Sequence, residues 1–80
     1  MRTLDLTEVG LAERGTLVAR KFDALSPGET LELVIDAPPW VLYHQLQTER
    51  FGEVVWDERE KGPERWVVHV TKTTRAGAPA

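Results

Sequence analysis

The sequence predicts an α+β fold, a two-layer sandwich in which two helices cover one face of a mixed four-stranded sheet. Six segments with strand-like or helix-like spacing of apolar residues follow one another in the order β-α-β-α-β-β. With 80 residues, 41% of them hydrophobic, the chain can bury one modest core, so both helices must lie on the same face of the sheet. The first strand–helix–strand unit should be right-handed and parallel, and the last two strands antiparallel, because a short turn joins them.

The first three elements follow from local patterns. Residues 3–6 alternate polar and apolar side chains, as a half-buried strand does. Residues 11–25 predict a helix, whose apolar stripe is Leu11, Val18, Phe22 and Leu25. The segment 26–29 ends this helix, because Pro and Gly stand at its two central turn positions. Residues 30–36 then predict a strand with Leu31, Leu33 and Ile35 on one face.

The second half predicts a helix and a hairpin. Pro38 and Pro39 exclude a continued strand but suit the first turn of a helix, which we expect to reach about Arg50. Its inward side chains would be Leu42, Tyr43 and Leu46. Residues 53–59 and 64–72 predict two strands around the turn Lys61-Gly62-Pro63. We expect residues 1–72 to form the domain and residues 73–80, which are small and polar, to form a flexible C-terminal tail.

The hairpin also predicts how the two faces of the sheet are filled. Trp56 and Trp66 are equidistant from Lys61, so we expect them to face each other, with Val54 opposite Val68. The uncovered face would then carry a small apolar patch with a histidine beside it, formed by Val34, Val67, Val55 and His69. We expect this open face to serve a protein partner or a weak homodimer.

Composition excludes several classes of protein. Without cysteine there is no disulfide framework, no thiolate zinc site and no thiol nucleophile. A net charge of -3 argues against a nucleic-acid partner, which would attract a basic face. Arg2 and Asp5 interrupt the N-terminus, and no apolar run approaches the roughly 20 residues of a membrane span. We therefore expect a cytoplasmic protein with no membrane partner.

Several short motifs together resemble the TusA (SirA-like) family of sulfur carriers: Leu4-Asp5, Pro27-Gly28-Glu29-Thr30-Leu31, and Asp36 with Pro38. The second half is similar to a bacterial branch of TusA-like domains of unknown function, through Leu42-Tyr43, Gly62-Pro63-Glu64 and Trp66. Some domains of that branch are fused to, or encoded beside, hemerythrin-like domains. The resemblance covers nearly the whole folded part and implies a sheet of order 1-2-4-3 with one strand reversed.

The same resemblance implies an activity that this chain lacks. TusA proteins carry sulfur as a persulfide on the cysteine of a Cys-Pro-x-Pro motif at the start of the first helix. The matching stretch here is Leu11-Ala12-Glu13-Arg14, with Leu11 at the cysteine position. A persulfide needs a thiol, so sulfur transfer by this chain is excluded. Gly15 and Ala37 stand where the branch of unknown function has histidines, so no role of those histidines carries over.

One candidate site follows from the topology. The carboxyl ends of the two parallel strands and the starts of both helices should converge at one edge, where ligands bind preferentially. The candidate residues there are Asp5, Glu13, Arg14, Asp36 and Trp40. Two prolines remove backbone donors and most of the side chains are acidic, so a cation or a partner's Lys or Arg fits this edge better than a phosphate. A plainer interpretation is that Asp36 caps the second helix and Trp40 covers an edge of the core.

Catalysis and metal binding have little support in the sequence. Ser26, the single serine, lies in a turn without a neighbouring histidine, and His44 and His69 lie on separate elements. We therefore expect no enzyme, no metal and no cofactor. The leading hypothesis is a non-catalytic interaction or regulatory module that has lost the sulfur-carrier cysteine. The alternative is a sensor domain that binds a small ligand or a metal at the helix-start edge.

Overall fold

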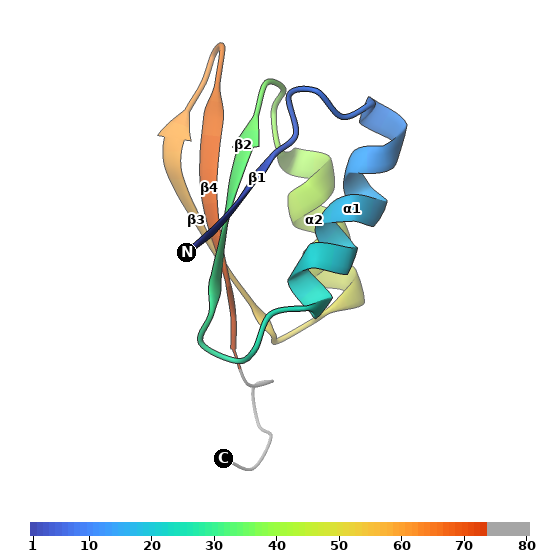
Figure 1. Cartoon of the computed structure of the whole chain (residues 1–80), viewed down its shortest axis with the longest axis vertical. Helices are drawn as coiled ribbons and strands as arrows, with labels where there is room; N and C mark the ends of the chain where they lie inside the picture. Colours follow the sequence, from blue (N-terminus) through green and yellow to red (C-terminus); the bar gives the residue numbers. More distant parts are fainter. Residues whose placement is uncertain (74–80) are drawn as a thin grey trace.

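The computed structural model describes residues 1–73 and has the element order β-α-β-α-β-β. The elements are β1 (Arg2–Asp5), α1 (Leu11–Asp23), β2 (Thr30–Ile35), α2 (Trp40–Glu49), β3 (Val54–Lys61) and β4 (Trp66–Lys72). The strands form one sheet of order β1-β2-β4-β3, and both helices cover the same face of it (Figure 1). The pair β1–β2 is parallel, and the pairs β2–β4 and β3–β4 are antiparallel. The predicted fold class is therefore confirmed. The expected tail lies, from residue 74 onward, outside the described residues.

The core lies between the helices and the covered face of the sheet. It joins one stripe of each helix to the inward residues of the central strands: Leu6, Val18, Phe22, Leu25, Leu31, Leu33, Ile35, Leu42, Leu46, Val68 and Val70. Two residues expected in this core are not buried. Leu11 is exposed because it begins α1, and Tyr43 is exposed on the flank of α2, with its ring against Trp56.

The hairpin register differs from the prediction. Trp56 lies opposite Val70 and Trp66 lies opposite Lys61, so the two tryptophans do not face each other. The turn is closed by a hydrogen bond from the Gly62 amide to the Arg65 carbonyl, with N and O 2.8 Å apart, and Lys61 therefore belongs to the strand. A bulge between Glu58 and Glu60 adds one residue to β3 and shifts the remaining pairs. Both indoles still pack against the core.

This register also separates the expected apolar patch on the uncovered face. Val34 and Val67 do lie opposite each other on β2 and β4. Val55 pairs with Thr71 instead, and Glu60 occupies the position beside Val67. The expected adjacency of the three valines is therefore wrong for Val55. Val67 is itself buried, whereas Val55 is half exposed.

Candidate functional site

The carboxyl ends of β1 and β2 and the starts of α1 and α2 lie at the same end of the molecule (Figure 1). The segment between β1 and α1 turns back through a hydrogen bond from the Val9 amide to the Leu6 carbonyl. The segment between β2 and α2 contains Pro38 and Pro39, and Pro39 precedes the first helical residue of α2. The predicted convergence is therefore confirmed, and we call this end the helix-start edge.

A partly buried ion pair joins the two segments of the helix-start edge. Arg14 Nη1 lies 2.7 Å from Asp36 Oδ1, and Arg14 Nε donates to the Val9 carbonyl at 2.9 Å. The Arg14 side chain is only 8% exposed, whereas that of Asp36 is 45% exposed. The start of α2 has no side-chain cap, so the expectation that Asp36 caps this helix is wrong. The carboxylate instead neutralises an arginine that is 22 residues away in the sequence.

The other three candidates stay apart from this ion pair. Asp5 accepts hydrogen bonds from the Thr7 amide and hydroxyl, at 2.9 and 2.6 Å, and these bonds lower the pKa of its carboxyl. Glu13 lies on the outer flank of α1, beside a shallow depression that Val9 and Arg20 also line. Trp40 is exposed, so the expectation that it covers an edge of the core is wrong. Sequence reasoning thus predicted that these segments converge and named Arg14 and Asp36 as candidates, but it did not predict that these two side chains pair.

An apolar groove of about 380 Å³ lies between the starts of the two helices. It is lined by Leu11, Ala12, Arg14, Gly15, Ile35, Pro38, Val41, Leu42 and Gln45. Ile35 and Leu42 belong to the buried core and form its apolar base. The side chains of Leu11 and Val41, by contrast, are 73% and 75% exposed. We call this feature the helix-start groove.

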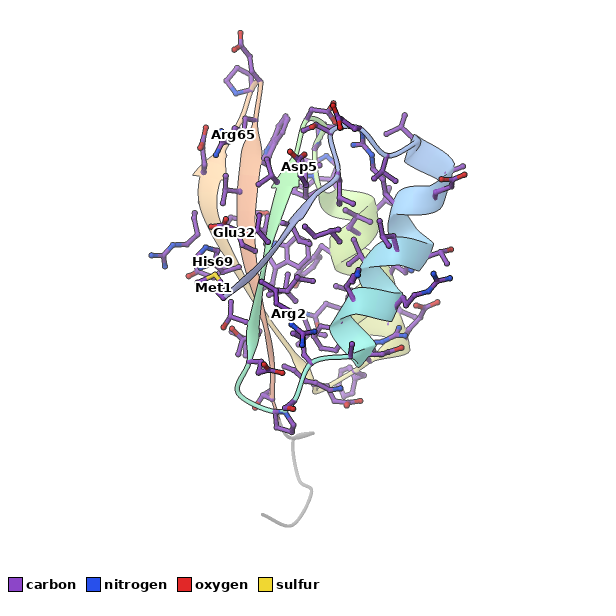
Figure 2. All side chains as sticks on the ribbon, viewed as in Figure 1. Met1, Arg2, Asp5, Glu32, Arg65 and His69 are labelled. Atoms are coloured by element: carbon purple, nitrogen blue, oxygen red, sulfur yellow. The ribbon has the colours of Figure 1, made fainter. Side chains whose placement is uncertain are left out.

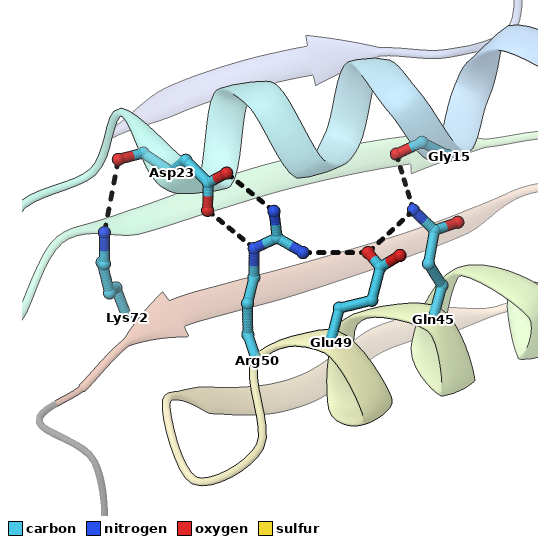
Figure 3. Close-up of polar contacts among 6 residues, drawn as sticks. All are labelled: Gly15, Asp23, Gln45, Glu49, Arg50 and Lys72. Atoms are coloured by element: carbon cyan, nitrogen blue, oxygen red, sulfur yellow. Dashed lines mark hydrogen bonds and ion pairs between the residues drawn. The ribbon is translucent and has the colours of Figure 1, made fainter.

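The groove is bounded where the two helices come together. Gln45 Nε2 donates to the Gly15 carbonyl at 3.0 Å, and a Cβ added at Gly15 would collide with the Gln45 side-chain oxygen. A larger residue at this position would therefore displace the flexible end of the Gln45 side chain from the Gly15 carbonyl. At the far end of both helices, Arg50 pairs with Asp23 and with Glu49 (Figure 3). These contacts hold the helices together below the groove.

Two groove residues were not singled out from the sequence. Val41 is apolar but lies outside the inward stripe of α2 that Leu42 and Leu46 form. An apolar residue outside such a stripe indicates an exposed apolar surface, and the sequence alone could have pointed to it. Nothing in the sequence pointed to Gln45, because its hydrogen bond to the Gly15 carbonyl forms only where α1 and α2 come together in the folded chain. Both residues are needed to describe the groove.

The uncovered face of the sheet carries a second polar cluster. His69 Nε2 lies 2.9 Å from Glu32 Oε2, and the Thr3 hydroxyl lies 3.2 Å from Glu32 Oε1. Figure 2 labels Glu32 and His69 on the side of the sheet away from the helices. The hydrogen bond with His69 is the main reason why the pKa of the Glu32 carboxyl lies below its usual value. This cluster connects three strands, β1, β2 and β4.

The donor set limits the chemistry of the described part of the chain. His44 contacts the Tyr43 ring and His69 pairs with Glu32, on different elements. Within residues 1–73, no three or more His, Cys, Asp or Glu side chains gather in a way that would hold a metal ion. The helices of the same residues are too short and polar to cross a membrane.

Comparison with known proteins gives one result. No curated protein and no solved structure matches the chain. A family model described as "Uncharacterized conserved protein (DUF2249)" matches residues 3–72, which is nearly the whole of the described part. On this match, the chain belongs to the DUF2249 family.

Proposed function

We propose that this chain is a non-catalytic interaction module of TusA-like ancestry, which binds a segment of a partner protein in the helix-start groove. The observation that carries the proposal is the three-quarters exposure of Leu11 and Val41 on an apolar groove. Apolar surface is stabilised when a partner removes it from water. Exposed apolar side chains gathered around a depression, rather than scattered singly, are typical of interaction sites.

The charges around the groove favour a particular partner chemistry. Arg14 is the only cation among its lining residues in the described chain, and Asp36 and the Val9 carbonyl already occupy it. The Asp36 carboxylate remains nearly half exposed. We therefore propose a protein segment with an apolar side chain for the groove and a Lys or Arg for this carboxylate.

The resemblance to TusA proteins supports the same location. In that family the sulfur-bearing cysteine begins the first helix, and Leu11 stands at the matching position of this chain. An apolar side chain there removes the thiol and adds contact surface. The proposed module thus keeps a binding site for a partner protein at this position, but without a thiol it cannot transfer sulfur.

A titration with defined peptides tests the proposal. The probes are peptides of about fifteen residues that place two leucines next to lysines, and matched peptides in which glutamate replaces every lysine. Amide chemical shifts of the isotope-labelled chain report binding residue by residue. We expect the basic peptide to shift amides of residues 11–15 and 40–45, and the acidic peptide to shift them far less. Equal binding of both peptides, or no groove shifts at about 1 mM peptide, overturns the proposal.

Two matched variants separate the groove from general hydrophobicity. Val41→Lys places a cation in the groove, which repels the lysines of the basic peptide, and Phe51→Lys makes the same change at an equally exposed apolar residue beyond the other end of α2. Val41→Lys should weaken binding of the basic peptide about tenfold or more, and Phe51→Lys should leave it nearly unchanged. Equal effects of the two changes contradict the groove as the binding site.

The same spectra test a sensor of small ligands or metals. Zinc chloride and sodium sulfate are titrated in place of the peptides. If either salt shifts the helix-start amides in a saturable way and the basic peptide does not, the proposed interaction module is wrong. The chain would then be a sensor that binds a small ligand or metal at the same edge.

A further inference from the structure

We propose that two copies of this chain associate by antiparallel pairing of their β1 strands, which joins the two sheets into one. β1 is an edge of the sheet, because its one neighbour in the order β1-β2-β4-β3 is β2. The pairing uses Arg2–Asp5 and none of the residues that line the helix-start groove. It therefore stands independently of the proposed function.

The backbone of β1 has groups directed away from the sheet. In a parallel pair, alternate residues direct both their N–H and C=O groups toward the neighbouring strand. The Leu6 amide donates to the Val34 carbonyl at 2.9 Å, so Leu4, two residues earlier, is directed toward β2 as well. Thr3 and Asp5 consequently direct their backbone groups outward, and both residues are exposed. Such groups are the template to which a further strand pairs.

The opposite edge of the sheet is protected, and β1 is not. β3 carries a bulge between Glu58 and Glu60 and a run of charged residues, Asp57–Lys61, and both features hinder pairing along an edge. β1 has the sequence Arg-Thr-Leu-Asp, without a proline, and pairs with β2 in unbroken register. Of the two edges, β1 is therefore the one that can accept another strand.

The sequence of β1 is complementary to itself in the antiparallel direction. With a two-fold axis at Leu4, Thr3 lies opposite the second copy's Asp5, and these two residues exchange two backbone hydrogen bonds. Symmetry repeats this pair on the other side of the axis. Leu4 then lies opposite the second copy's Leu4, at the position where side chains on paired strands come closest. Leu4 is partly exposed and already packs against the core, so the pairing would complete its burial.

The centre of β1 favours a second copy over an unrelated strand. Arg2 and Leu4 are alternate residues and share the covered face of the sheet, where they line a depression with Lys21 and Leu31. Asp5 belongs to the other face, at the other end of the strand, which Figure 2 labels. In the register above, the two-fold axis sets one partly exposed Leu4 against another, an apolar match that a strand with a polar residue at this position lacks.

The association must be weak, because four-residue strands bury much less than the ~1,200 Å² of a standard stable interface. Sedimentation of the full chain is therefore measured at concentrations up to about 1 mM. We expect the weight-average mass to rise with concentration, together with amide shifts confined to residues 2–7. A wild-type chain that remains monomeric overturns the proposal, and so do concentration-dependent shifts confined to residues 11–15 and 40–45.

Two sets of variants test the strand itself. Thr3→Pro removes an outward N–H at an edge position, where proline is tolerated, and should abolish association. The control, Arg59→Pro, places a proline at the bulge of the other edge and should leave association intact. Thr3→Lys sets a cation opposite the second copy's Asp5 on the same face of the joined sheet, and Thr3→Glu sets a like charge there. Thr3→Lys should therefore associate more than wild type and Thr3→Glu less; equal association of these two variants overturns the proposal, even if Thr3→Pro fails to fold.

Discussion

The Arg50 guanidinium donates two parallel hydrogen bonds to the Asp23 carboxylate, with Nε 2.6 Å from Oδ1 and Nη2 2.7 Å from Oδ2 (Figure 3). The contact joins the residue that follows α2 to the last residue of α1. Arg50 also lies 2.9 Å from Glu49, and the Lys72 ammonium lies 3.3 Å from the Asp23 carbonyl oxygen. The pair lowers the pKa of the Asp23 carboxyl and raises that of the Arg50 guanidinium. It thus ties both helices together at the end opposite the groove.

The first prediction concerns the pH dependence of this pair. The Asp23 carboxyl has a lower pKa in the folded chain than in the unfolded chain, so its contribution to stability is full above the unfolded pKa of ~3.9. That contribution is lost as the pH falls through the folded pKa. Asp23 is more than half exposed, so Asp23→Asn should cost only ~0.5–1 kcal/mol at neutral pH. Urea unfolding of both proteins at pH 7 and at about pH 2.5 checks this, and an undiminished difference in acid contradicts it.

A second prediction uses the unequal burial of Arg14 and Asp36. If Asp36→Ala removes the carboxylate, the nearly buried Arg14 guanidinium loses its counter-charge. If Arg14→Met removes the guanidinium, Asp36 is left nearly half exposed and water can solvate it. Asp36→Ala should therefore lower the free energy of unfolding by about 1–3 kcal/mol, and Arg14→Met by less. Equal losses in urea titrations would show that the ion pair is effectively solvated on both sides.

A third prediction concerns the aromatic contact between α2 and β3. The Tyr43 and Trp56 rings lie 5.2 Å apart at an interplanar angle of 75°, an edge-to-face arrangement. Such pairs contribute ~0.5–1.5 kcal/mol beyond the burial of each ring. A double-mutant cycle with Tyr43→Ala and Trp56→Ala should give a coupling energy in the lower part of this range, because Tyr43 is partly exposed. Tyr43→Phe is the control that keeps the ring and should retain the coupling.

The fourth prediction places a thiol at the start of α1. Leu11 is largely exposed and is the first residue of the helix, so a cysteine there would be accessible and close to the helix N-terminus. Leu11→Cys should react rapidly with iodoacetamide in the native state, with its pKa lowered by the helix end and partly restored by Glu8 and Glu13. The rate of alkylation against pH gives this pKa. A thiol that reacts only after unfolding would show that residue 11 does not lie on the exposed start of α1.

The sequence allowed the element order and most of the core to be predicted, because both depend on local spacing. Leu31, Leu33 and Ile35 alternate along β2, and Val18 and Phe22 recur at the helical interval, and all five are buried. The parallel pairing of β1 with β2 follows from the handedness of strand–helix–strand units, and the antiparallel pairing of β3 with β4 follows from the short turn between them. The chain is too short to cover both faces of the sheet, so both helices lie on one face. These features need no knowledge of distant contacts.

The details that failed depend on contacts between distant segments. The prediction that Trp56 faces Trp66 counted residues outward from Lys61 and assumed that each residue of β3 pairs with one residue of β4. The bulge in β3 adds a residue, so that assumption is wrong. Asp36 follows β2 as a capping residue would, but the buried Arg14 is a stronger partner than the amides of α2. The groove itself is lined by residues of α1, of α2 and of the end of β2, and no single segment contains that information.

The position of β4 has a practical consequence for attaching this domain to a surface or to another protein. The Gly28 amide donates to the Lys72 carbonyl, and the Lys72 amide donates to the Glu29 carbonyl. On the other side of the strand, the Thr73 amide donates to the Glu53 carbonyl. The end of β4 is therefore hydrogen-bonded on both sides. This end lies at the pole opposite the helix starts (Figure 1). A tether joined after residue 73 therefore leaves both the groove and the β1 edge open, and pulls on the strand where hydrogen bonds hold it on both sides. A tether before Met1 would instead prolong the very strand that we propose to pair.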